Sequence, residues 1–300
     1  MENQVSPLLN LEQVVIHSNP ILDDSYAYIS SMDPLTRHDY HYILEKIEHG
    51  WITERDIEIV KFIFVHRWVT LSQISRLFFP DTERENTIRK RIGKMLKYGL
   101  LRKVRWTSYS RQTENRPSLY ELGASGADIL KYKFGTFIGQ RDPRSPKQAT
   151  MLFRMRYIIT NELYIQLRSC FNLVHFEFHP VLNYKDEQQV PTATFALKNP
   201  KGKRLPFFLI CHREDEKWLK TVRFQAVFYS KYLMEIGKGN TLVILVSTSE
   251  KAEIANKILE QEGVKGAWFI TDEDLYNDQK SLTDSFFTYQ DQQKVYFDLN

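Results

Sequence analysis

The sequence predicts two domains of different class, a winged helix-turn-helix followed by an α/β domain. Three observations lead to this prediction. Residues 53–123 hold three helical patterns and then a β-hairpin pattern, which is the order of elements in a winged helix-turn-helix. The same stretch concentrates positive charge. From residue 147 onward, amphipathic segments alternate with short apolar runs, as helices and strands do in an α/β domain.

Positive charge is unevenly distributed along the chain. Fifteen lysines and arginines lie between residues 53 and 116 against seven acidic residues, although the formal net charge of the whole chain is only +4. A lysine or arginine that meets a phosphate releases a condensed counterion, so this concentration is expected of a segment that binds a polyanion. A solvated basic face without a ligand is the alternative interpretation.

Length and composition narrow the class of protein. A chain of 300 residues corresponds to about two domains. No apolar run approaches the roughly 18–20 residues that cross a bilayer, and the start of the chain lacks the basic residues and apolar core of a secretory signal. Two cysteines, Cys170 and Cys211, are too few for a disulfide framework. We therefore expect a cytoplasmic protein that has no membrane contact.

Residues 1–50 form a separate compositional zone with eight acidic residues against Arg37 and Lys46. We predict an acidic, partly ordered arm that contains one short helix over residues 39–49, ended by Gly50. Two interpretations remain open. The arm packs loosely on the first domain as a solvated extension, or its acids compete with DNA for the basic face.

Helix start signals place the first two helices of the winged helix-turn-helix, which we assign to residues 51–134. Thr53 is a good N-cap for a helix over residues 54–67. Thr70 and Gln73 have the spacing of a capping box, and a second short helix follows that ends near Pro80.

The third helix and the hairpin carry most of the basic residues. Capping-box spacing at residues 82–85 starts the helix, its apolar positions recur with helical period, and Gly99 ends it. Residues 100–106 and 118–122 then predict two strands around a basic loop. In a winged helix-turn-helix, the third helix enters the major groove and this loop, the wing, touches the backbone or minor groove.

The helix and the wing provide the candidate DNA contacts. These are Arg84, Asn86, Thr87, Arg89, Lys90, Arg91, Lys94, Lys97, Arg102, Lys103, Arg105, Arg111 and Arg116. Asn86, Thr87, Lys90 and Arg91 lie in the half of the helix that reads base edges, although each also suits a phosphate contact. The wing arginines 105, 111 and 116 suit phosphates.

Residues 135–146 are rich in glycine, proline and charge, and we predict a linker there. The second domain then spans residues 147–300. Helices are predicted over residues 147–170, 216–236 and 249–261, and strands over residues 174–179, 192–197, 205–211, 242–246 and 267–271. Two aromatic stretches, residues 285–289 and 295–297, pack across a dimer interface or cap their own domain.

Several motifs of this chain resemble the replication-relaxation proteins of plasmids and conjugative elements in Gram-positive bacteria. They are TERDIEIVKFIFVHRWVTLSQISRLFF, KMLKYGLLRKV, YELGASG, and the series VPTATFAL, RLPFFLICHR and FQAVFYSKYL, which together run from about residue 53 to residue 272. The resemblance implies a winged helix followed by a restriction-endonuclease-like domain. It also implies a role in plasmid replication or in mobilisation at a transfer origin.

A nuclease of that fold needs an Asp on one strand and an acid-x-Lys-like pair on the next to hold a divalent metal. The matching positions here are Pro191-Thr192 and Ile210-Cys211-His212, and none is acidic. Nearby acids, at residues 186, 187 and 214–216, fall in predicted loops and charge runs. We therefore expect a domain that lacks the catalytic acids and is not an enzyme.

Neither a zinc site nor a nucleotide site is predicted, and hence no cofactor. His175 and His179 lie four residues apart on a predicted strand, about 13 Å, too far to share one metal ion directly. Gly237-Lys238-Gly239-Asn240 lacks the spacing of a phosphate-binding loop.

The sequence thus predicts a double-stranded DNA-binding protein of a plasmid, phage or integrative element, acting in replication, mobilisation or their regulation. One alternative is a transcriptional regulator whose second domain mediates dimerisation or partner binding. A metal-dependent DNA nuclease is the second alternative. We expect a homodimer, and other replication or transfer proteins are candidate partners.

Overall fold

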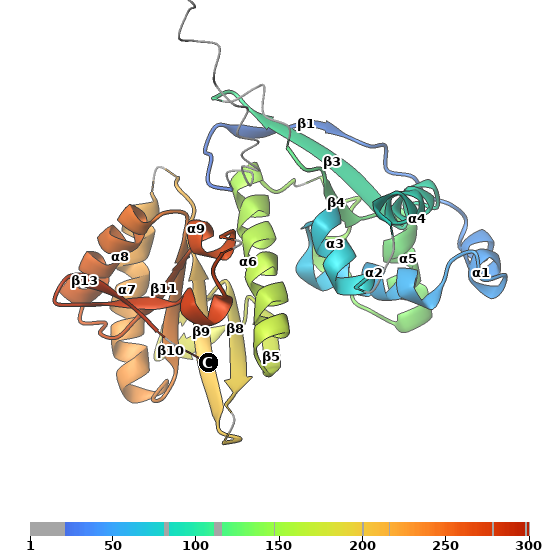
Figure 1. Cartoon of the computed structure of the whole chain (residues 1–300). Helices are drawn as coiled ribbons and strands as arrows, with labels where there is room; N and C mark the ends of the chain where they lie inside the picture. The colour runs from blue at the N-terminus through green and yellow to red at the C-terminus, as the bar shows by residue number, and fades with distance from the viewer. Residues whose placement is uncertain are drawn as a thin grey trace, which may run out of the picture.

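The computed structural model of this chain is an α+β protein whose two larger sheets lie on either side of a long helix (Figure 1). It describes residues 22–80, 84–110, 116–146, 148–199, 201–215, 217–277, 279–297 and 299. We refer to residues 22–146 as the amino-terminal unit and to residues 148–299 as the carboxy-terminal unit. Within these described ranges, no helix has the length and apolarity needed to span a membrane.

Three helices of the amino-terminal unit follow the predicted order. They are α2 (Glu54–His66), α3 (Leu71–Phe78) and α4 (Glu85–Lys97). The amide of Thr53 donates to the Asp56 carboxylate at 2.8 Å, and Thr70 and Gln73 form a reciprocal capping box. The cap predicted at residues 82–85 lies mostly outside the described residues, and α4 begins at Glu85 after Arg84.

The hairpin forms where the sequence predicts it. Strands β3 (Leu101–Ser108) and β4 (Leu119–Leu122) pair antiparallel, with Leu101 opposite Leu122 and Val104 opposite Leu119. A two-residue strand, β2 (Val69–Thr70), pairs with β4. The predicted wing lies between β3 and β4, and residues 111–115 of it are outside the described residues.

The arm predicted at residues 1–50 is, in its described part, a structural part of this sheet. Residues 27–32 form strand β1 (Ala27–Met32), which pairs antiparallel with β3 and gives the strand order β1-β3-β4-β2. Helix α1 (Tyr40–Glu48) matches the short helix expected over residues 39–49. The alternation in AYISSM is too weak to predict a strand, because none of the residues of this edge strand is fully buried. Residues 1–21 lie outside the described residues.

Close backbone contact explains one glycine at the junction of α4 and β3. Gly99 has φ +66°, and a Cβ atom there would lie 2.2 Å from the carbonyl oxygen of Thr36. Only glycine combines this left-handed conformation with so short an approach. The segment that joins β1 to α1 therefore packs directly against the end of the basic helix.

The expected linker at residues 135–146 is held against the amino-terminal unit. It follows a helix that we did not predict, α5 (Ala124–Phe134), and contains the single turn η1 (Gly139–Arg141). Arg141 donates to the carbonyl of Phe64 at 2.9 Å. Arg144 forms an ion pair with Asp128 of α5 at 2.9 Å. The glycines and prolines of this segment therefore form turns in a chain segment that is held in place, and it is not a free linker.

Helix α6 (Met151–Cys170) joins the two units. The sequence assigns it to the second domain, but its side chains share one hydrophobic core with residues of both units, among them Trp68 and Val104 on one side and Phe195 and Leu209 on the other. It is buried around much of its circumference. A helix that is apolar on more than one face is typical of a position between two layers.

The carboxy-terminal unit is a mixed sheet covered by helices on both faces. Its strands lie in the order β13-β12-β11-β10-β9-β8-β5. They are β5 (Leu173–Phe178), β8 (Ala193–Lys198), β9 (Arg204–Cys211), β10 (Thr241–Val246), β11 (Trp268–Thr271), β12 (Phe287–Gln290) and β13 (Gln293–Tyr296). Strands β9, β10 and β11 are parallel to one another, and the other neighbours are antiparallel.

Alternation along the strands assigns side chains to the two faces. On β9, Leu209 and Cys211 point to the core beside α6, whereas Phe208 and Ile210 point to the core beside α7 (Trp218–Glu235) and α8 (Ser249–Gln261). The remaining described elements are the hairpin β6 (Leu182–Tyr184) with β7 (Glu187–Gln189), helix α9 (Asp272–Leu275) and the turn η2 (Leu282–Asp284).

The sequence predicts the last strand at residues 267–271, but two further strands follow it in the structure. The two aromatic stretches near the chain end contribute β12 and β13, which extend the sheet beyond β11. Phe287 is fully buried within its own unit. Phe286 and Phe287 of the first stretch therefore complete the core of this unit, whereas Tyr296 of the second stretch is exposed. Packing of the first stretch within its own domain was one of the two interpretations of the sequence.

Candidate nucleic-acid interface and a polar cluster in the carboxy-terminal unit

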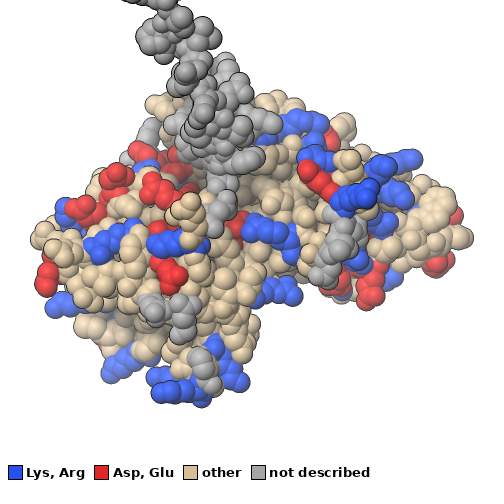
Figure 2. All heavy atoms as spheres, viewed as in Figure 1, with Lys and Arg blue, Asp and Glu red and all other residues tan. Residues whose placement is uncertain are grey.

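Helix α4 divides sharply into an apolar side and a basic side. Ile88, Ile92 and Met95 are buried in the core of the amino-terminal unit. On the opposite side, the exposed residues include the predicted contacts Arg84, Asn86, Thr87, Arg89, Lys90, Lys94 and Lys97, together with one acidic residue, Glu85. Figure 2 shows cationic side chains gathered over the part of the molecule that holds α4.

Three lysines of this helix remain without an acidic partner. Lys90, Lys94 and Lys97 form no ion pair with any other residue that the structure describes. Arg89 is paired with Glu85 one turn earlier on the same helix, at 2.9 Å. An exposed pair of this kind is weak, so Arg89 can exchange Glu85 for another anion at low cost.

A groove borders the exposed lysines. Its lining residues come from the start of α2, the end of α3 and the outer side of α4, and they are Thr53, Glu54, Arg55, Phe79, Thr87, Lys90, Arg91 and Lys94. The guanidinium of Arg55 lies 4.8 Å from the centre of the Phe79 ring. The groove thus combines cationic groups with an aromatic surface next to the first half of α4.

Arg91, a predicted base contact, points inward instead. Its Nε donates to Asp56 Oδ1 at 2.7 Å, and its Nη2 donates to Thr53 Oγ1 at 2.8 Å. Asp56 is buried. This arginine therefore attaches α4 to the first turn of α2. Helical periodicity could have indicated this, since position 91 lies three residues after the buried Ile88 and four residues before the buried Met95.

The hairpin arginines are also largely engaged inside the protein. Arg102 donates to Glu121 Oε1 at 2.6 Å, and Arg105 donates to Asp33 Oδ1 at 3.0 Å. Lys103 is half-buried. Arg105 is the most exposed of them and remains accessible to a ligand.

Arg116 is placed differently from a phosphate contact at a wing tip. Its side chain is 1% exposed, it forms an ion pair with Asp24 at 3.5 Å, and its guanidinium lies 4.5 Å from the Trp106 ring. Arg111 lies outside the described residues. The structure thus brings together the exposed predicted contacts of α4. Arg91, Arg102 and Arg116 do not belong to this surface, because each forms contacts inside the protein.

The two units meet through buried polar contacts around α6. Glu121 accepts from Arg102, from Arg154 of α6 at 2.5 Å and from Trp68 Nε1 at 2.7 Å. Burial alone would raise the pKa of Glu121, but the charges of Arg154 and Arg102 outweigh it and hold the pKa below its ordinary value. No local sequence pattern predicts this cluster, because its members are spread over 87 positions of the chain, from Trp68 to Arg154.

A second buried contact joins α2 to α6. Asn161 Nδ2 donates to the carbonyls of His66 and Trp68 at 3.1 and 2.9 Å, and Asn161 Oδ1 lies 2.8 Å from His66 Nδ1. Burial lowers the pKa of His66 to about 4, so the ring is neutral at pH 7. Arg76 of α3 pairs with Glu162 of α6 nearby.

The positions matched to nuclease acids adjoin one another in the sheet but hold neutral groups. The amide of Cys211 at the end of β9 donates to Thr192 Oγ1 at 2.9 Å, just before β8. His212 is buried, and burial together with the charge of Arg156 lowers its pKa to about 3. Among the described residues, no group of three His, Cys, Asp or Glu side chains could hold a metal ion.

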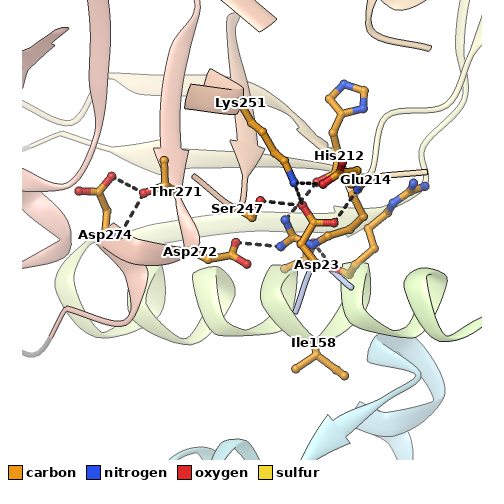
Figure 3. A network of polar contacts seen from close by, with 12 residues as sticks. Asp23, Ile158, His212, Glu214, Ser247, Lys251, Thr271, Asp272 and Asp274 are labelled. Atoms are coloured by element: carbon orange, nitrogen blue, oxygen red, sulfur yellow. Dashed lines mark hydrogen bonds and ion pairs between the residues drawn. The ribbon is translucent and has the colours of Figure 1, made fainter. Parts of the chain in front are cut away.

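An ion-pair cluster lies directly beyond these positions (Figure 3). Asp23, which precedes β1, reaches across to the carboxy-terminal unit and accepts from Lys251 Nζ at 2.9 Å and from Ser247 Oγ at 2.6 Å. Lys251 also donates to Glu214 at 2.5 Å. Burial alone would raise the pKa of Asp23, but the charge of Arg213 and these hydrogen bonds outweigh it and lower the pKa.

Arg213 and Asp272 form the buried base of the cluster. They are joined by a hydrogen bond of 2.9 Å from Arg213 Nη2. Burial raises the pKa of Asp272 to about 6, assisted by the negative charge of Asp23 and opposed by Arg213. Arg213 also donates to the carbonyl of His212 at 3.0 Å. Several hydrogen bonds and ion pairs therefore fix the cluster, and one of its carboxylates, that of Asp23, comes from the amino-terminal unit.

Comparison with known proteins gives one family. Residues 60–181 match the family model described as replication-relaxation. The matched segment runs from within α2 through α6 and β5, so it includes α4 and the hairpin but ends before Thr192 and His212. No curated protein and no solved structure matches the chain.

Proposed function

We propose that this protein binds double-stranded DNA through α4 and the β3–β4 hairpin, as a winged helix-turn-helix. It would act in the replication or mobilisation of a plasmid or other mobile element, or in the regulation of these processes. The match of residues 60–181 to the replication-relaxation family supports the element-related role. The exposed lysines of α4, which have no acidic partner in the described part of the chain, carry the DNA-binding part of the proposal.

The structure of α4 suits a major-groove helix for a physical reason. Its apolar side is buried in the core, its middle is attached to α2 by the contacts of Arg91, and its carboxyl end is fixed by the Gly99 junction. The basic side is therefore presented on a rigid element. Lysines that have no internal partner lose only their hydration when they meet a phosphate, and counterion release then favours binding.

The test compares DNA binding at several salt concentrations. A Lys90→Ala/Lys94→Ala variant is titrated with a fluorescent duplex from the protein's own genetic element. We expect weaker binding and a salt slope reduced by about two, one for each lost phosphate contact. Lys220→Ala, at an exposed position of α7 in the other unit, is the matched control and should leave the slope unchanged. An unchanged slope in the double variant would refute the assignment of α4.

We also propose that the carboxy-terminal unit is a non-catalytic scaffold of restriction-endonuclease-like fold. The observation behind this is that the neutral Thr192, Cys211 and His212 occupy the matched positions, and that Glu214 is bound to Lys251. A nicking assay on supercoiled plasmid with Mg²⁺ or Mn²⁺ tests it. We expect no cleavage. Cleavage that Glu214→Ala abolishes would instead support the nuclease alternative.

A further inference from the structure

The segment before β1 ties the two units together, and we call residues 22–26 the strap. Leu22 is buried in the core shared by both units. Asp23 contacts the carboxy-terminal unit, whereas the next residue, Asp24, pairs with Arg116 and accepts from Ser110 of the hairpin at 3.3 Å. Two consecutive carboxylates thus face opposite units.

The Asp23 carboxylate accepts hydrogen bonds from three donors, all of which belong to the carboxy-terminal unit. Its Oδ1 accepts from the backbone amide of Glu214 at 2.5 Å, and its Oδ2 accepts from the Ser247 hydroxyl and the Lys251 ammonium. The donors come from the segments that follow β9 and β10 and from the first turn of α8. Figure 3 shows Asp23 between them. The side chain of Asp23 is only 2% exposed.

These donors form an oxyanion site of a common kind. A backbone amide, a hydroxyl and a lysine ammonium at a helix N-terminus are groups that proteins use for phosphate, and ligands of open α/β sheets bind beyond the carboxyl ends of the parallel strands. Arg213 adds a buried positive charge. Its Nε is buried without a hydrogen-bond partner among the described residues, so this arginine keeps one donor that no described group uses.

We propose that this cluster is a binding site for a phosphate group, and that Asp23 is its intramolecular occupant. A phosphate at the end of a DNA strand, or a free phosphate, would take the place of the Asp23 carboxylate and retain its three donors. Glu214, whose side chain is 56% exposed, can turn toward solvent and release Lys251 to the incoming anion. The proposal does not depend on DNA binding by α4.

Because Asp23 occupies the site, the unaltered protein should bind external phosphate with low affinity. A tethered ligand acts at an effective concentration on the order of millimolar, and the apparent affinity for an external ligand falls with the fraction of open sites. Release of the strap would uncover the site and at the same time free Asp24 from Arg116. Phosphate binding is therefore coupled to the contact between the strap and the hairpin.

Calorimetric titration with inorganic phosphate and with a 5′-phosphorylated dinucleotide tests the proposal. We expect Asp23→Ser, which removes the carboxylate and leaves room, to bind at least about tenfold more tightly than the unaltered protein. Asp23→Asn keeps the shape and loses the charge, so it should fall between the two. Adding Lys251→Ala to Asp23→Ser should abolish the gain. Thermal unfolding with and without phosphate checks that each variant folds and is stabilised by the ligand.

Asp33→Asn is the matched control, because Asp33 is also an acidic residue of the arm that pairs with an arginine, Arg105. It should leave phosphate affinity unchanged. Binding of both probes indicates a general phosphate site, and binding of the dinucleotide alone indicates a strand end; both results support the proposal. Equal affinity of the Asp23 variants and the unaltered protein, or a gain that persists without Lys251, overturns it. Lys90→Ala/Lys94→Ala should not affect these titrations, which separates this test from that of DNA binding.

Discussion

The cations of α4 and the cations around α6 carry the same charge, yet the structure uses them in opposite ways. Lys90 and Lys94 are exposed and have no acidic partner among the described residues. Arg154 is 2% exposed and shares Glu121 with Arg102. In a count of charges along the sequence, Arg102 and the lysines of α4 belong to one basic stretch. The comparison teaches that burial, not local charge density, decides which cations can meet a ligand.

The physical reason lies in hydration. An exposed lysine keeps its water and can exchange it for a phosphate, whereas a buried arginine has lost its water and depends on its carboxylate. Removal of one partner from a buried pair leaves an uncompensated charge, which is why such pairs are costly to break. Removal of an exposed charge changes the stability little. Four expected outcomes sharpen this comparison, from the largest to the smallest effect on stability.

The largest effect is expected at Glu121. Glu121→Ala leaves Arg102, Arg154 and the indole N–H of Trp68 without their shared acceptor, so we expect a loss of about 3–5 kcal/mol in the free energy of unfolding. Urea unfolding measures it. Glu85→Ala, which breaks the exposed pair with Arg89, is the control and should cost less than about 0.5 kcal/mol. Equal losses of unfolding free energy in both variants would contradict the difference between buried and exposed ion pairs.

The second effect contrasts two arginines of one helix. Arg91→Ala leaves the buried Asp56 without its partner and should cost about 3 kcal/mol. Arg89→Ala should be nearly neutral for stability but weaken DNA binding. Unfolding curves and duplex titrations on both variants check this. A stable Arg91→Ala protein that has lost DNA affinity would restore Arg91 as a DNA contact.

The third outcome concerns pH. Burial lowers the pKa values of His66 and His179 to about 4 and that of His212 to about 3. The unfolded chain therefore binds protons near the ordinary histidine pKa of about 6.5 that the folded chain does not. The stability that these neutral rings contribute is present above that pH and is lost as the pH falls toward 4.

Asp272 opposes this trend, since its pKa is raised to about 6 and its contribution is lost as the pH rises toward that value. Three histidines outweigh one aspartate, so we expect stability to fall by about 2 kcal/mol between about pH 6.5 and pH 5.5, at about 1.4 kcal/mol per pH unit for each net proton. Melting temperatures across this range measure it. A flat profile would contradict the burial of these rings.

The smallest effect is expected on the exposed face of α4. Lys94→Ala should change the free energy of unfolding by less than about 0.5 kcal/mol, because Lys94 has no partner among the residues that the structure describes. Urea unfolding next to the Glu121 series provides the measurement. A large loss would show that the lysine has a structural role and would weaken its assignment as a ligand contact.

Local patterns predicted most of the elements. Thr53 and Thr70 mark the starts of α2 and α3, Gly99 ends the third helix, and the apolar run at residues 242–246 is the buried strand β10. These signals depend on neighbours within a few residues, which a sequence contains in full. Strand β1 escaped prediction because an exposed edge strand needs little apolar alternation, and the two last strands because their aromatic residues fit a strand and a surface equally well.

The sequence by itself determined the order of the helices, the hairpin, the amphipathic basic helix α4 and the absence of acids at Thr192, Cys211 and His212. Only the tertiary structure decided which arginines are free, because pairing of Arg91 with Asp56 or of Arg102 with Glu121 depends on distances between separate elements. It also decided that Asp23 reaches Lys251, 228 residues away in the chain. Secondary structure follows from short-range periodicity and capping, whereas the partner of a charged group follows from packing.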